Sequence, residues 1–242
     1  MLGVFAAAGG ILGILHTSLL SARHVMVTGI HHTSRMAVLR AAGLLGSPPL
    51  IDVGSARADR RIEALPWVET ARVSRRWPDS VTVSVVERVP IALVTAGPSG
   101  GARRSWTVSV VDGSGRVLEV LGQAPSDLAQ LPTLMVPDSA GRPGSWLGPA
   151  AGPALEVAGS IPRVLRSEVR QVKVVAGGVA LGLADGASVV FGPATMIPEK
   201  YEALASLLAV TSPQPGSSVD VTVPEDPMVV PPPTGAGASA RS

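Results

Sequence analysis

The chain has 242 residues, which is enough for one large domain or for two small domains with linkers. Charged residues make up 16% of it, against about 25% in typical soluble domains, and the formal net charge is +2. So small a charge gives no basis for nucleic-acid binding. The absence of cysteine excludes disulfide bonds and thiolate metal sites.

The first segment predicts a transmembrane anchor over residues 1–22. Leu2 to Leu20 carries no charge apart from a titratable His16, and as a helix it would span about 28 Å, close to the hydrocarbon thickness of a bilayer. A signal peptide is the main alternative, but no basic residue precedes the apolar run, and Leu20-Ser21-Ala22 lacks the first small residue of a cleavage site. A buried core helix is a third interpretation. The flanking charges do not fix the orientation.

Residues 23–92 are predicted to form a compact β-α-α-β-β module. Val25 to Val27 is a short strand candidate, and the stretches Ala71–Ser74 and Val81–Val85 alternate apolar and polar residues on either side of a Pro-Asp-Ser turn. Two helices are expected between the first strand and the other two. A three-stranded sheet with both helices on one face is the simplest arrangement for a module of this length.

Polar residues predict where the two helices of this module begin. Thr33 or Ser34 can cap the first helix, and Asp52 or Ser55 can cap the second, because their side-chain oxygens accept hydrogen bonds from unpaired backbone N–H groups. Pro66 is expected to end the second helix.

Residues 93–224 are predicted to form a mixed or antiparallel β domain with helices. The Gly-Pro-Ser-Gly-Gly run at 97–101 predicts a loop near its start. Hairpins are expected over 106–120, where Asp-Gly-Ser-Gly forms the turn, and over 169–183, around two glycines.

The rest of this region predicts two helices and two strands. The helices are expected over 150–165, with an interruption near Gly159 and Pro162, and over 197–209, and the strands over 188–191 and 219–223. Residues 225–242 are rich in proline and small residues and are predicted to be a disordered tail. The fold class expected for the whole chain is therefore α+β, with an N-terminal transmembrane helix in front of the two modules.

No residue pattern predicts a catalytic, cofactor or metal site. His31-His32 is the densest histidine site, but nearby carboxylates are not at ligand spacing, and a surface turn is the commoner structure. Gly113-Ser114-Gly115 is half of a nucleophile motif, but no histidine follows it in the chain. Asp52, Asp59 and Glu63 could pair as catalytic carboxylates, although a helix cap and a solvated helix face are commoner.

Two further patterns concern binding. Arg75-Arg76-Trp77 could stack on nucleic acid, but exposed arginines at a strand end are much the commoner explanation, and the cluster would lie outside the cytoplasm if the anchor is correct. The final strand, 219–223, precedes the proline-rich tail and can lie at the edge of a sheet, where unpaired backbone groups accept a strand from a partner. A fully paired interior strand is the alternative.

Four sequence blocks carry a resemblance to a known family. They are VTGIHHTSRMAVLRAAGL at 27–44, LPWVETARVSRRWPDSVTVSVVERVPIAL at 65–93, VVFGPATMIPEKYEALASLL at 189–208, and VDVTVPEDPMVV at 219–230. In this order they resemble the FtsQ/DivIB family of bacterial cell-division proteins. The resemblance implies a POTRA domain followed by the family's β domain.

The resemblance also implies a location and a role. It implies a single-pass protein of the inner (plasma) membrane, with its bulk outside the cytoplasm and enriched at the division septum. Such proteins are non-catalytic scaffolds that bind the coiled-coil proteins FtsB and FtsL, without nucleic acid, cofactor or small-molecule substrate, and help to control septal wall synthesis. The partner segment would add to the terminal strand, formed here by Val219, Asp220, Val221, Thr222 and Val223, with Lys200 and Tyr201 nearby.

Two other functions stay open at this point. A POTRA module also fits an assembly or secretion factor for outer-membrane proteins, although that hypothesis predicts a transmembrane barrel of alternating strands or a tandem of POTRA repeats, and the sequence pattern shows neither. A membrane-anchored enzyme is the third hypothesis, and turnover by residues 23–242 in a wall-hydrolase assay would support it.

Overall fold

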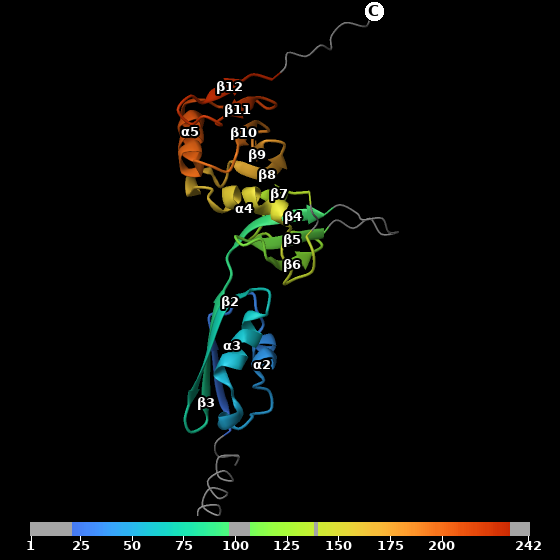
Figure 1. Cartoon of the computed structure of the whole chain (residues 1–242), viewed down its shortest axis with the longest axis vertical. Coiled ribbons are helices and arrows are strands. Elements are labelled where there is room, and N and C mark those ends of the chain that lie inside the picture. Colours follow the sequence, from blue (N-terminus) through green and yellow to red (C-terminus); the bar gives the residue numbers. More distant parts are fainter. Residues whose placement is uncertain (1–20, 97–106, 138–139, 233–242) are drawn as a thin grey trace, which may run out of the picture. The chain divides into compact units, whose positions relative to one another are not determined.

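A computed structural model of the chain describes residues 21–96, 107–137 and 140–232 (Figure 1). The chain divides into two compact units, residues 1–88 and residues 89–242. The boundary expected after Ala92 therefore falls inside a strand, β4 (Pro90–Ala96), which pairs with its neighbours in the second unit. The loop expected at the glycine-rich run, 97–101, lies outside the described residues.

Most of the predicted anchor, residues 1–20, also lies outside the described residues. Ser21 and Ala22, which were assigned to the anchor, belong to the first unit: Ala22 is buried, and its N–H donates to the carbonyl of Pro48 at 2.9 Å. Within the described ranges, no helix combines the length and the apolar character needed to span a membrane.

The first unit has the predicted β-α-α-β-β order. Its elements are β1 (His24–Thr28), α2 (Arg35–Ala42), the short 3-10 helix η2 (Leu50–Asp52), α3 (Ser55–Glu63), β2 (Val68–Arg76) and β3 (Ser80–Glu87). The sheet has the order β1-β3-β2, with β1 parallel and β2 antiparallel to β3. Figure 1 shows α2 and α3 on one face of this sheet.

Alternating residues create the core of the first unit. Val81, Val83 and Val85 of β3 are buried, as are Val38 of α2 and Ile62 of α3. The alternation places one face of the central strand against both helices, as the sequence predicts.

Local backbone chemistry fixes the entry and exit of these helices. Ser34 caps α2 by accepting a hydrogen bond from the N–H of Ala37 at 3.2 Å. This confirms one of the two caps expected for that helix, Thr33 or Ser34. The cap expected for α3 is wrong, because Gly54 occupies the cap position and Asp52 lies in the preceding 3-10 turn. Gly29 has a φ of +80°, and a Cβ there would lie against the carbonyl oxygen of Val85.

The second unit is a nine-stranded mixed sheet with helices. After β4 its elements are β5 (Thr107–Asp112), β6 (Val117–Leu121), β7 (Thr133–Met135), η3 (Pro149–Ala151), α4 (Gly152–Gly159), η4 (Arg163–Leu165), β8 (Val169–Val175), β9 (Gly178–Leu183), β10 (Ser188–Gly192), α5 (Ile197–Val210), β11 (Ser218–Asp220) and β12 (Met228–Val230). The strand order is β12-β11-β10-β9-β8-β7-β4-β5-β6.

The predicted hairpins of the second unit are confirmed as β5–β6 and β8–β9, and β10 and α5 lie where the sequence places them. Three strands were not predicted: β4, β7 and β12. The tail expected to be disordered from residue 225 contains β12 and is described as far as residue 232, so that prediction is wrong for this part of it.

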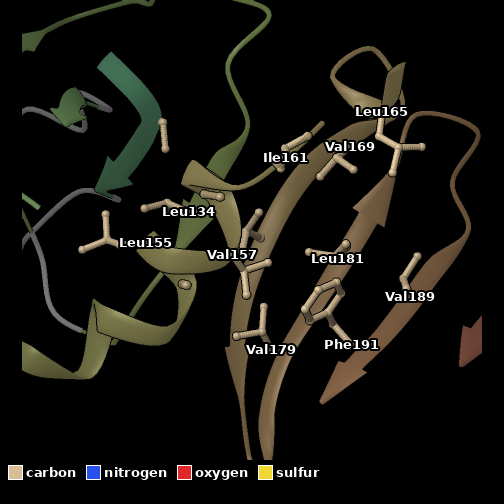
Figure 2. Packing of buried hydrophobic residues seen from close by; sticks show 14 of the residues in the cluster. Leu134, Leu155, Val157, Ile161, Leu165, Val169, Val179, Leu181, Val189 and Phe191 are labelled. Atoms are coloured by element: carbon tan, nitrogen blue, oxygen red, sulfur yellow. The ribbon is translucent and has the colours of Figure 1, made fainter. Parts of the chain in front are cut away.

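One apolar core joins α4, α5 and the sheet. Figure 2 shows Val157 of α4 facing Leu181 and Phe191 of the strands, and Leu155 of the same helix near Leu134. Tyr201 of α5 joins this core, with its ring centroid 5.0 Å from that of Phe191. The helices α4 and α5 therefore cover the apolar face of the sheet, which the valine and leucine side chains of its strands form.

A substitution in β7 tests how far this sheet depends on its shortest central strand. Leu134 is 1% exposed, and Leu134→Ala should lower the unfolding free energy of the second unit by about 2–5 kcal/mol because it leaves a cavity. Urea denaturation of the full chain, with hydrogen exchange to assign each transition to its unit, measures this change. Met135→Ala is the control, since Met135 is 45% exposed and should change stability little. Equal losses in the two variants would contradict the assigned packing.

Candidate protein-interaction edge

The strand that the sequence places at the edge lies inside the sheet. β11 comprises Ser218–Asp220 and pairs with β10 on one side and with β12 on the other. Val221 follows the strand, is buried, and donates its N–H to the carbonyl of Val190 at 3.1 Å. Of the two alternatives, the paired interior strand is therefore confirmed and the edge strand over 219–223 is wrong, because the chain turns back after 223 and adds another strand.

The turn after β11 explains why the strand is short. The N–H of Thr222 donates to the Asp220 carboxylate at 2.8 Å, which closes a local turn. Val223 is exposed and precedes Pro224. The alternating pattern of residues 219–223 fits a strand, but this side-chain hydrogen bond bends the backbone away from the ladder.

β12 is the outermost strand at this end of the sheet. Met228, Val229 and Val230 are 54%, 37% and 50% exposed, and among the described residues only β11 pairs with them. Prolines at 227 and 231 flank the strand and, lacking N–H groups, limit the ladder to these three residues. An exposed apolar strand with a free side is a site at which another strand can pair.

The edges of the first unit are covered by side chains. At β2, the N–H of Ala71 donates to Glu63 at 3.2 Å and that of Val73 donates to Asp59 at 2.7 Å. At β1, Arg35 donates to the carbonyl of Val25 at 2.7 Å. These contacts occupy backbone groups that an added strand would need, and they give the carboxylates of α3 a structural role.

The opposite end of the large sheet is covered in part, at the first residue of β6. The N–H of Val117 in β6 donates to the carbonyl of Ser145 at 2.8 Å, and the carbonyl of Val117 accepts from Gly144 at 2.7 Å. Of the strand edges formed by the described residues, β12 is the one along which no hydrogen bond occupies the outer side.

A groove lies beside β12. It runs between α5 and the segment that connects β11 to β12, and its lining includes exposed Val210 together with Leu207 of α5. Glu199, Glu202 and Glu225 add carboxylates around this apolar surface. The edge and the groove together present backbone hydrogen-bonding groups, apolar side chains and negative charge to a partner.

Comparison with known proteins agrees with this architecture. The FtsQ-type POTRA domain family matches residues 20–88, which end where the first unit ends. The cell division protein FtsQ of Streptomyces collinus is 30% identical over 232 residues, covering 91% of this chain and 82% of that protein. The chain belongs to the FtsQ family.

Other FtsQ relatives match most of the chain. FtsQ of Mycolicibacterium smegmatis is 33% identical over 230 residues, and FtsQ of Mycobacterium leprae is 32% identical over 229 residues. These matches cover 95% and 93% of this chain but 62% and 61% of the mycobacterial proteins. The chain thus spans about three fifths of the length of these two relatives.

Two of the residues predicted near the partner site are buried in this FtsQ-family chain. Lys200 and Tyr201 are 2% and 1% exposed. Lys200 donates to the carbonyl of Pro193 at 2.8 Å, and Tyr201 donates to the carbonyl of Val157 at 2.8 Å. Burial lowers the pKa of Lys200 and raises the pKa of Tyr201. Both side chains hold α5 in place, and direct partner binding by the seven predicted residues remains a prediction.

The histidine pair lies on a turn around a buried carboxylate. Glu87 accepts hydrogen bonds from the backbone N–H groups of His32, at 3.0 Å, and Thr33, at 2.7 Å. The His32 ring stacks on Trp67 with a centroid distance of 4.1 Å. Within the described residues, no three metal-ligating side chains gather as a metal site.

The remaining sequence candidates occupy ordinary structural positions. Ser114 donates its hydroxyl to Asp112 at 2.7 Å inside the β5–β6 turn. The same Asp112 oxygen also accepts from the backbone N–H groups of Ser114 and Arg116, each at 2.9 Å, so these contacts close the turn. Trp77 is exposed after the end of β2, which carries Arg75 and Arg76.

The pKa of Glu87 predicts acid sensitivity of the first unit. Burial alone would raise this pKa, but the backbone hydrogen bonds outweigh it and lower the pKa from 4.5 to about 2. A lowered carboxyl pKa stabilises the fold above the unfolded value and loses this effect as pH falls through the folded value. The contribution, about 3 kcal/mol at neutral pH, should be lost between pH 4.5 and 2.

Unfolding of the first unit, measured from pH 5 to pH 2 in the parent, in Glu87→Gln and in Glu69→Gln, tests this. Glu87→Gln should be less stable at pH 5 and should show a flatter pH dependence than the parent. Glu69 is an exposed control on β2, and its variant should follow the parent. The same pH dependence in all three proteins would contradict the role of Glu87.

Proposed function

We propose that this protein is a non-catalytic scaffold of the bacterial division complex. It would be held in the plasma membrane by a single N-terminal span, with both units outside the cytoplasm, and enriched at the septum. It would bind coiled-coil proteins of the FtsB and FtsL kind and couple them to septal wall synthesis. Membership of a family of cell-division proteins supports this role.

The single observation that carries the partner-binding proposal is the uncovered edge at β12. A partner strand that pairs with Met228–Val230 would extend the sheet through main-chain hydrogen bonds. Three residues offer few such bonds, so side-chain contacts must add affinity. The adjacent groove with Leu207 and Val210 can supply them to apolar residues of the partner, and its glutamates favour basic ones.

This assignment changes what a proline substitution in the predicted strand would do. Val221→Pro would remove the hydrogen bond from Val221 to Val190 and disturb a buried position. Its main effect is expected on the stability of the second unit. It is therefore a poor test of partner binding.

A pair of lysines on β12 provides a sharper test. Met228 and Val230 are two residues apart, so they share one face of the strand. Met228→Lys/Val230→Lys places two charges at the edge, which opposes strand addition. We expect the full chain with this pair to bind FtsB-like and FtsL-like partners at least about tenfold more weakly, since each lysine disfavours pairing by a kcal/mol or so.

Val164→Lys/Val175→Lys is the matched control. It adds the same charge at two exposed valines outside β12. Binding should be measured by titration with the purified partner complex, and circular dichroism should report that both variants are folded. Partner binding that is unchanged in the β12 pair, or equally weakened in both pairs, would place the interaction elsewhere.

Localisation tests the division role independently of the edge. A fluorescent protein fused before Met1 should form a band at mid-cell when the septum forms. A uniform membrane signal, in cells that divide normally without the native protein, would contradict the scaffold and favour the assembly-factor hypothesis. The same fusion carrying the β12 lysine pair shows whether recruitment depends on the edge.

A further inference from the structure

A second concave surface lies in the same unit, away from β12 in the strand order. It forms where the parallel strands β4, β7 and β8 begin, and it is completed by the end of α4 and by η4. Because parallel strands start at one end of a sheet, segments distant in the sequence meet there. We call this surface the arginine pocket; its lining includes Pro90, Ile91, Leu131, Ile161 and three arginines.

The arginines give the pocket a positive charge. Arg163, Arg166 and Arg170 all line it, and their side chains are exposed. Among the described residues, none of the three has an ion pair or a side-chain hydrogen bond. Asp127 is the one carboxylate in the lining, so the formal charge of the lining is +3 − 1 = +2.

Two neighbouring features reduce this positive potential without cancelling it. Glu168 lies between the arginines in sequence, but it accepts a hydrogen bond from Ser167 at 3.2 Å and is not part of the lining. The C-terminal end of α4, at Ala158 and Gly159, carries a partial negative charge that falls off within one turn. The positive charge of three guanidinium groups is larger than both negative contributions together, because each group carries a full charge and five N–H donors.

The floor of the pocket is apolar. In this part of the lining, which we call the floor, Ile161 and Pro132 are buried, and Pro90, Ile91 and Leu131 are half-buried. Its volume of about 510 Å³ is within the range of sites that enclose a ligand of a few residues. A free phosphate would fill a small part of this space and leave the apolar floor in water.

We propose that the arginine pocket binds a short acidic peptide segment of another protein, with carboxylates on the arginines and an apolar side chain on the floor. Guanidinium groups bind carboxylates through paired hydrogen bonds, and arginine clusters recognise acidic motifs. A membrane surface fits less well, because a flat layer of headgroups cannot reach a concave apolar floor. The pocket would give this scaffold a second interface, opposite in charge to the groove beside β12.

The probe is a fluorescent peptide of alternating glutamate and leucine, about six residues long, titrated into the full chain. The test variant is Arg163→Glu/Arg166→Glu. Its matched control, Arg142→Glu/Lys173→Glu, makes the same change in net charge at two exposed residues of the second unit outside the pocket. Hydrogen exchange with and without peptide locates the binding site.

The peptide should bind the parent and the control alike, bind the test variant at least about tenfold more weakly, and protect residues 127–132 and 163–170. Met228→Lys/Val230→Lys should leave this binding unchanged, which separates the pocket from the proposed β12 interface. No binding to the parent, equal losses in the test and control variants, or equal binding of a glutamine-leucine peptide would overturn the proposal. Binding to phosphatidylglycerol vesicles but not to the peptide would also overturn it and assign the pocket to a membrane surface.

Discussion

The architecture of the second unit depends on parallel pairing by a strand of three residues. Thr133–Met135 pairs with β4 on one side and with β8 on the other. These two ladders join the group β4-β5-β6 to the group that runs from β8 to β12. Leu134 at the centre of the strand is buried in the core shared with α4, so packing compensates for the few hydrogen bonds of a short strand. Both candidate binding surfaces depend on the sheet that this pairing completes.

Hydrogen bonds at the edges decide where the protein can accept another strand. Side chains of α3 and α2 occupy backbone groups of β2 and β1, and the segment around Ser145 pairs with the first residue of β6. β12 is left open on its outer side among the described residues, between two prolines that keep it short. A short open edge limits indiscriminate pairing, since a partner must add side-chain contacts to the few main-chain bonds. This combination suits a surface for a specific partner.

Buried polar side chains fix the helix and the turn to which they belong against the rest of each unit. Lys200 donates an ammonium N–H to the carbonyl of Pro193, and Tyr201 donates its hydroxyl to the carbonyl of Val157, which fixes α5 against the segment after β10 and against α4. Glu87 does the same in the first unit by accepting two backbone N–H groups. In each case the hydrogen bond offsets the free energy of removing a polar group from water. From the sequence alone such residues look like surface residues, because the sequence shows that they are polar but does not show that they are buried.

Local pattern by itself determined a large part of this fold. The alternation in β3, the capping serine at 34 and the glycine turns of the hairpins predict elements whose stabilising contacts lie close in sequence. The four sequence blocks that resemble the FtsQ/DivIB family also predicted the family, and the comparisons confirmed that prediction. The tertiary structure decided the rest. Strands of three residues between prolines, β7 and β12, have too few residues to show a period, and only their partners make them strands. The edge strand is β12 and not β11, and the three arginines line one pocket with the apolar floor. Both follow from pairing between segments distant in the sequence, which sets which backbone groups and side chains become neighbours.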